Sequence, residues 1–219
     1  MIKPISSALL IFGCAWQLTA MAEADDSGRD LVDSFVNDVA TFAGDFEQTL
    51  IDANGDILEV SRGRLEIQRP GKFRWAYVEP YEQWLLADGL NIWSYDVDLA
   101  QATVKPQAEA LTNTPALLLG GSTSALDDFV YDGSNEEGGL TWVRMRPVDT
   151  DSGFSRLELA FSDNTLSRMV FFDNLAQTTV VTLTCVVVND EIDPTHFEFS
   201  APDDVDIVGT PAVPDTASP

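Results

Sequence analysis

The 219-residue chain contains few of the residues from which catalytic and metal sites are usually built. It has one histidine, His196, and two cysteines, Cys14 and Cys185. A single histidine excludes most zinc sites and most Ser-His-Asp or Cys-His catalytic arrangements. Two cysteines, one of them inside an N-terminal apolar run, cannot form a disulfide framework. These absences predict a protein that does no covalent chemistry and needs neither a metal nor a cofactor.

Basic residues are also scarce. Twelve lysines and arginines stand against 36 aspartates and glutamates, and the formal net charge is −24. Nucleic-acid binding needs clustered Lys and Arg that displace counterions from phosphates, so this balance argues against a nucleic-acid partner. It also disfavours static adsorption to an anionic membrane surface. The sequence has no glycine-rich phosphate loop and no EF-hand spacing, and we find no enzyme in it.

No apolar run is long enough to span a membrane, which needs roughly 20 residues. The longest candidate, residues 8–18, follows a lysine at position 3 and precedes two A-x-A sites. This is the pattern of a secretory signal peptide, with cleavage after residue 22 or 24. We therefore expect residues 1–24 to be removed on export.

The remaining chain has the composition of one globular domain, since 45% of all residues are apolar and 22% are charged. We place this domain at residues 25–208. The last segment, residues 209–219, has the sequence GTPAVPDTASP, with three prolines and little apolar content. It is predicted to be an extended, disordered tail.

Hydrophobic periodicity predicts one helix followed by many short strands. Residues 30–40 place Val36 and Val39 with other apolar residues on one helical stripe. From residue 41 the period changes to two, so that Phe42 and Phe46 share a face. Further strands are predicted at residues 57–69, 72–78, 83–87, 91–95, 140–146, 154–161, 166–173, 178–188 and 196–199.

Residues 108–130 interrupt the strands with two predicted short helices, the first broken near Pro115 and the second at about 125–129. Short strands with Gly, Asn and Asp turns predict a curved or barrel-like antiparallel sheet, with helices over one face. On its strand, His196 is expected to face solvent, and Cys185 is expected to be buried. The strands are rich in aromatic residues, which fit either a filled core or the wall of an apolar cavity.

A series of short motifs, in a fixed order, resembles the periplasmic outer-membrane lipoprotein carrier family, LolA. Phe42, Phe46 and Gln48 resemble the first strand of that family, and Phe197 to Phe199 with Pro202 the last. The motifs between them are Arg69-Pro70-Gly71-Lys72-Phe73-Arg74-Trp75, Pro80-Tyr81-Glu82-Gln83, Asp88-Gly89, Trp93-Ser94-Tyr95-Asp96, Gln101-Ala102-Thr103 and Asn113-Thr114-Pro115-Ala116. The resemblance covers about residues 30–208.

The resemblance implies a mainly β protein of the α+β class, an incomplete antiparallel β-barrel with a helical lid over a hydrophobic cavity. It implies a monomeric periplasmic chaperone that binds the acyl chains of triacylated lipoproteins. An inner-membrane ABC transporter would release these lipoproteins to it, and an outer-membrane receptor lipoprotein would accept them.

The resemblance also implies roles for particular residues. Arg69 matches the arginine whose hydrogen bonds to the lid favour the closed state. The expected wall of the acyl-chain cavity comprises Val36, Val39, Phe42, Phe46, Phe73, Trp75, Trp93, Leu117, Leu118 and Leu119.

Two other functions compete with this one. Residues 11–14 loosely resemble a lipobox, and lipidation of Cys14 would make the chain the anchored receptor of the same pathway, which shares the fold. A periplasmic β scaffold that binds no lipid would instead have a filled core and an exposed patch. Mass spectrometry of the exported N-terminus separates the first alternative from the carrier.

Overall fold

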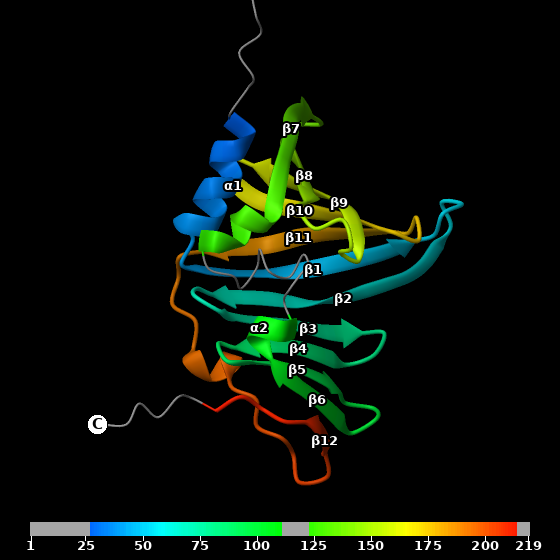
Figure 1. The fold of residues 1–219 in the computed structure, drawn as a ribbon, viewed down its shortest axis with the longest axis vertical. Coiled ribbons are helices and arrows are strands. Elements are labelled where there is room, and N and C mark those ends of the chain that lie inside the picture. The colour runs from blue at the N-terminus through cyan, green and yellow to red at the C-terminus, as the bar shows by residue number, and fades with distance from the viewer. Residues whose placement is uncertain (1–26, 111–122, 214–219) are drawn as a thin grey trace, which may run out of the picture.

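The structure, a computed structural model, describes residues 27–110 and 123–213 (Figure 1). Its strands are β1 Thr41–Ile51, β2 Ile57–Gln68, β3 Lys72–Glu79, β4 Gln83–Asp88, β5 Asn91–Asp96, β6 Gln101–Pro106, β7 Phe129–Glu137, β8 Leu140–Pro147, β9 Phe154–Ser162, β10 Thr165–Asp173, β11 Thr178–Val188 and β12 Asp206–Gly209. They form one sheet in the order β12-β6-β5-β4-β3-β2-β1-β11-β10-β9-β8-β7. All neighbours are antiparallel except β12 and β6. Because β12 and β7 are separate edges, the barrel is incomplete.

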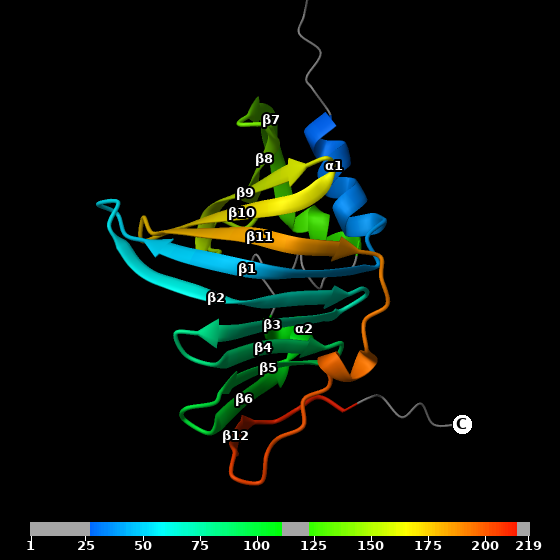
Figure 2. The ribbon, with the colours of Figure 1, turned by 180° about the vertical axis from the view of Figure 1, so that it is seen from behind.

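The helices of the described residues are α1 (Ser27–Asn37), α2 (Gln107–Ala110) and the 3-10 helices η1 (Thr123–Asp128) and η2 (Pro194–Phe197). The first three lie over the side of the sheet that faces the viewer in Figure 1, and α2 lies behind the strands in the opposite view of Figure 2. We call this the inner side of the sheet and the other the outer side. The predicted fold, an incomplete barrel with helices over one side, is confirmed.

The apolar stripe of α1 produces its packing. Val32, Phe35 and Val36 are each less than 5% exposed and face the sheet. The helix lies three residues earlier than predicted at both ends. The chain turns from helix to strand where the Asn189 side-chain oxygen accepts a hydrogen bond from the backbone N–H of Ala40 at 2.7 Å. This contact joins the start of β1 to the end of β11.

A bulge and a glycine let β2 and β3 approach closely under an aromatic ring. The register shifts where Arg62 pairs with Glu79 but Gly63 pairs with Tyr77. A Cβ at Gly63 would overlap the backbone oxygen of Ala76 and lie 2.8 Å from the Phe46 ring. The position therefore requires glycine, as close backbone approach in a sheet commonly does.

Gly63→Ala is expected to destabilise the fold by about 3 kcal/mol, because neither the Ala76 backbone nor the buried Phe46 ring can move freely. Gly153→Ala is the matched control, since its added Cβ meets nothing within 4 Å. That control should change the free energy of unfolding by less than about 0.5 kcal/mol. Urea denaturation of both variants measures the difference, and equal stability would contradict the packing described here.

Two predictions about the second half of the chain are wrong. Residues 196–199 are not a strand, because Asp193 caps η2 by accepting a hydrogen bond from the Thr195 N–H at 2.9 Å, with a proline in the first turn. Cys185 is exposed. The register shift opposite Gly44 gives Cys185 a left-handed φ of 51°, which changes the alternation of sides along β11.

Strands β6, β7 and β12 were not predicted. The last of these changes the expected tail, because Gly209 belongs to β12 and pairs with Val104. Beyond β12, the Asn91 side chain donates a hydrogen bond to the backbone carbonyl of Ala212 at 3.1 Å and accepts one from the Ala212 N–H at 2.6 Å. The chain is therefore attached to the sheet as far as Ala212.

Candidate functional site

The inner side of the sheet carries one contiguous apolar cluster, which continues from β5 round to β8 and is covered at one end by α1. Aromatic side chains form much of it. The Phe35 ring of α1 meets Phe42 edge-on, with centroids 5.9 Å apart. Phe46 lies 5.2 Å from both Trp75 and Tyr77. Because these rings come from α1, β1 and β3, the cluster exists only in the folded sheet.

Most of the expected cavity residues within the described ranges belong to this cluster. Five are cluster members and no more than 7% exposed, and Val39 is partly buried against them. The five members are Val36, Phe42, Phe46, Phe73 and Trp75. Leu117, Leu118 and Leu119 lie outside the described residues. Every second side chain of β1 and β3 points to the inner side, and this brings together side chains that are far apart in the sequence.

Trp93 does not belong to the inner cluster, which corrects its expected place in the cavity wall. Its ring stacks on Phe199 at 4.6 Å, and its Nε1 donates to Asp88 at 2.8 Å. The neighbouring residue Ile92 pairs with Ala87 and occupies the inner side instead. Since successive strand residues point to opposite sides, Ile92 inward requires Trp93 outward.

Arg69 lies at the end of β2 and contacts α1 and the segment after it. Its Nη1 donates to the Val39 carbonyl at 3.0 Å, and its guanidinium carbon lies 4.7 Å from the centre of the Phe35 ring. Burial lowers the pKa of Arg69 to about 10, so the group stays charged at neutral pH. The expected lid partners in residues 111–122 lie outside the described residues.

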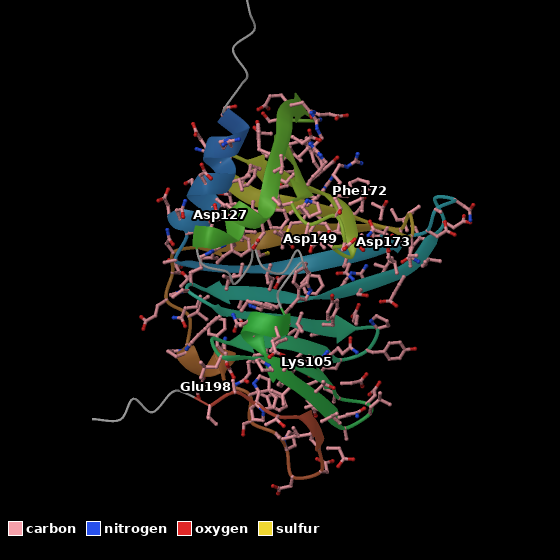
Figure 3. All side chains as sticks on the ribbon, viewed as in Figure 1. Lys105, Asp127, Asp149, Phe172, Asp173 and Glu198 are labelled. Atoms are coloured by element: carbon pink, nitrogen blue, oxygen red, sulfur yellow. The ribbon has the colours of Figure 1, made fainter. Side chains whose placement is uncertain are left out.

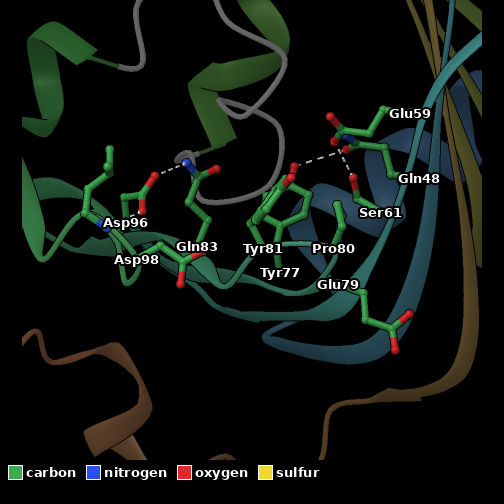
Figure 4. A pocket seen from close by; sticks show the side chains of 11 residues that line it. Gln48, Glu59, Ser61, Tyr77, Glu79, Pro80, Tyr81, Gln83, Asp96 and Asp98 are labelled. Carbon is green, nitrogen blue, oxygen red and sulfur yellow. Dashed lines mark hydrogen bonds between the residues drawn. The ribbon is translucent and has the colours of Figure 1, made fainter.

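A polar pocket of about 510 Å³ opens where β2 and β4 begin and β3 ends, and it borders the cluster at Tyr77 (Figure 4). The Tyr77 hydroxyl donates to Gln48 Oε1 at 3.1 Å. Gln83 donates to Asp96 at 3.2 Å across the pocket. Its other acidic walls are Glu59, Glu79 and Asp98. The apolar inner side thus ends in this acidic, hydrogen-bonding pocket, which we call the acidic mouth and which no motif in the sequence indicated.

Burial raises the pKa of Tyr77 to about 12. In the unfolded chain this phenol titrates near its ordinary value of about 10. The folded state therefore binds more protons between these values, and the stability contributed by Tyr77 is lost as pH rises through that window. An absorbance titration of tyrosinate should contain a late step that disappears in Tyr77→Phe. Its absence in the wild type would show that Tyr77 is accessible to water.

The single histidine has a structural contact on the outer side. His196 Nδ1 lies 3.1 Å from Oε1 of the buried Glu66. The same carboxylate pairs with two arginines, Arg64 at 3.4 Å through Oε1 and Arg74 at 3.7 Å through Oε2. His196 therefore contacts a carboxylate, whereas it was expected only to face solvent. Within residues 27–110 and 123–213, no group of three or more His, Cys, Asp or Glu side chains could hold a metal ion.

Comparison with known proteins finds similarity over most of the chain. The family model described as outer membrane lipoprotein carrier protein LolA matches residues 37–200. The outer-membrane lipoprotein carrier protein of Chromobacterium violaceum is 35% identical over 206 residues, covering 94% of this chain and 98% of that protein. The outer-membrane lipoprotein carrier protein of Nitrosospira multiformis is 37% identical over 183 residues, covering 83% of this chain and 88% of that protein.

A solved structure shares the fold at low sequence identity. An uncharacterized conserved protein from Thermus thermophilus is 13% identical, with a TM-score of 0.53 over 84% of this chain and 97% of that one. In the part of the chain that the structure describes, no helix is long and apolar enough to cross a membrane. With the family model matching most of its length and relatives above one-third identity, the chain belongs to the LolA family of outer-membrane lipoprotein carrier proteins.

Proposed function

We propose that the protein is a periplasmic carrier that holds the acyl chains of triacylated lipoproteins against the inner apolar cluster. The observation that carries the proposal is the cluster itself, which is apolar along the inner side of the sheet and covered by a separate helix. Each acyl CH₂ exposed to water costs about 0.8 kcal/mol, so three chains cost tens of kcal/mol outside a membrane. Transit between membranes therefore requires an apolar container.

Loading requires the cluster to open, because its members are no more than 8% exposed in this structure. The acyl chains would replace contacts now made by α1 and by Ala110 and Leu126. Arg69 stabilises the closed arrangement through the Val39 carbonyl and the Phe35 ring. A charged hydrogen bond of this kind contributes about 1.5–3 kcal/mol, enough to change the balance between empty and loaded states.

The partners follow from the direction of transport. A releasing ABC transporter of the inner membrane would supply the lipoprotein, and a receptor lipoprotein of the outer membrane would accept it. The acidic mouth beside Tyr77 is the polar exit through which the polypeptide part of the cargo leaves the apolar cluster. The carrier acts as a monomer, since the sheet and α1 of one chain supply the whole cluster.

Photo-cross-linking at two tryptophan positions tests the site. A benzophenone amino acid at Trp75 lies in the inner cluster, and the same group at Trp93 lies on the outer side. We expect a triacylated lipoprotein, loaded by the reconstituted transporter with ATP, to cross-link from position 75 and not from position 93. Equal cross-linking from both positions would contradict binding on the inner side, and none from position 75 would favour a β scaffold.

The receptor alternative makes a different covalent prediction. As a carrier, the exported chain begins after residue 22 or 24, whereas a receptor would begin with a lipidated Cys14. Mass spectrometry of the mature N-terminus distinguishes them, and an acylated Cys14 would overturn the carrier assignment.

A further inference from the structure

The outer side of β8, β9 and β10 has a charge opposite to that of the rest of the chain. These three strands contain four arginines and only two acidic residues, Glu158 and Asp173. Over the whole chain, acidic residues outnumber basic ones by 36 to 12. One-third of all basic residues therefore lies on three adjacent strands, on the side away from the apolar cluster.

Register places the outward side chains of these strands in a grid. Its first two rows are Trp142, Ala160 and Arg168, and then Arg144, Glu158 and Val170. The third row pairs Arg156 with Phe172, and Arg146, two residues beyond Arg144 on β8, lines the same pocket as these two residues. We call the four arginines and the two aromatic residues of this grid the arginine face. Glu158 is the only acid among the nine positions. Figure 3 draws the side chains of the described residues and labels Phe172 of β10.

Two of the four arginines have no acidic partner among the described residues. Arg144 donates only to the neutral Asn135 side chain, at 2.8 Å, and Arg168 makes no ion pair. The Nε of Arg168 is buried and has no hydrogen-bond partner. In a chain with three acids for each base, two such cations on the same side of the sheet are poorly explained by internal stability.

The other two arginines show how the face engages a carboxylate. Arg156 Nε lies 3.1 Å from Glu158 as an ion pair without hydrogen-bond geometry, and its guanidinium carbon lies 3.9 Å from the centre of the Phe172 ring. Arg146 pairs with Asp132 at 3.1 Å. Together with Phe172, Arg146 and Arg156 line a pocket of about 610 Å³. Arginines beside partly exposed aromatic rings are typical anchor residues of protein interfaces.

We propose that the arginine face binds an extended acidic polypeptide segment of a partner protein. Alternate side chains of an extended segment lie about 6.6–6.8 Å apart, the same spacing that separates Arg144 from Arg146 along β8. Carboxylates on alternate residues can therefore pair with successive arginines. An anionic membrane is the less suitable partner, since a bilayer would also face the acidic remainder of a chain with net charge −24.

Fluorescence anisotropy with a labelled peptide in which glutamate alternates with threonine tests the proposal on the mature protein. The double variant Arg144→Gln/Arg168→Gln should bind this peptide about tenfold or more weakly than the wild type, because it loses two charge-assisted contacts. Lys72→Gln/Lys105→Gln is the matched control, since it removes the same charge from the other half of the sheet. It should retain at least half of the affinity.

The proposal would be overturned if the wild type did not bind the peptide, or if both double variants bound it equally well. A further contradicting outcome combines two results: the peptide does not bind, and the wild type but not the arginine variant floats with phosphatidylglycerol vesicles. The last would make a membrane the partner. Acyl-chain loading should be the same in the arginine variant and the wild type. Failure of the peptide experiment would therefore leave the carrier function standing.

Discussion

Phe73→Glu should lose at least about 4 kcal/mol of unfolding free energy at neutral pH, a large part of the stability of a typical domain. Phe73 is fully buried in the inner cluster, between Ile67 of β2 and Ala87 of β4. The substitution removes an aromatic ring and puts a carboxyl group where no water can solvate it. Defective loading by this variant would therefore arise from a disrupted fold, so Phe73→Glu is a test of packing.

The pH dependence identifies the cause. Burial raises a carboxyl pKa in the folded state, so the folded variant binds more protons than the unfolded chain. Its stability should therefore fall as pH rises through that raised pKa and recover on acidification relative to the wild type. Tyr81→Glu is the matched control, because Tyr81 is 68% exposed. Denaturation curves that are the same for the two glutamate variants would contradict the burial of Phe73.

Arg69→Leu should accept lipoprotein but deliver it to receptor-bearing vesicles about ten- to a hundredfold more slowly, under the proposed function. The substitution removes the donor to Val39 and the cation over the Phe35 ring. Losing about 1.5–3 kcal/mol from the closed, empty state leaves the loaded state relatively more stable. Release, which requires closure, is therefore the step that slows.

A transfer time course with purified, preloaded carrier measures this effect. Arg62→Leu is the control, since Arg62 pairs on the outer side with the exposed Glu47 and Glu79 and touches neither α1 nor the cluster. The control should transfer at the wild-type rate. Wild-type transfer by Arg69→Leu would show that the contacts at Val39 and Phe35 do not govern release.

Local patterns in the sequence predicted those parts of the site that depend on one strand or one helix. Alternation identified Phe42, Phe46, Phe73 and Trp75, because these large apolar residues alternate with charged or small residues along β1 and β3. The failure at Trp93 has a physical cause. Phe199 from the C-terminal segment also covers the outer side of β5. A large aromatic residue on this strand therefore does not indicate which of the two sides it faces.

Other features could not be predicted because they depend on contacts between distant segments. The short strand β12 exists through its parallel pairing with β6, which Asn91 reinforces at Ala212. The exposure of Cys185 depends on one extra residue in β11, opposite Gly44. The acidic mouth at Tyr77 combines residues from β1 to the turn after β5, none of which forms a motif by itself.

The most direct test of the carrier function is native mass spectrometry of the mature protein with a triacylated lipoprotein in the absence of detergent. The reconstituted transporter and ATP are included so that loading does not depend on spontaneous opening. We predict a one-to-one complex that keeps the lipoprotein in solution and is lost when the acyl chains are removed. Only unliganded carrier in solution, with the lipoprotein still in the transporter vesicles, would contradict an acyl-binding inner side.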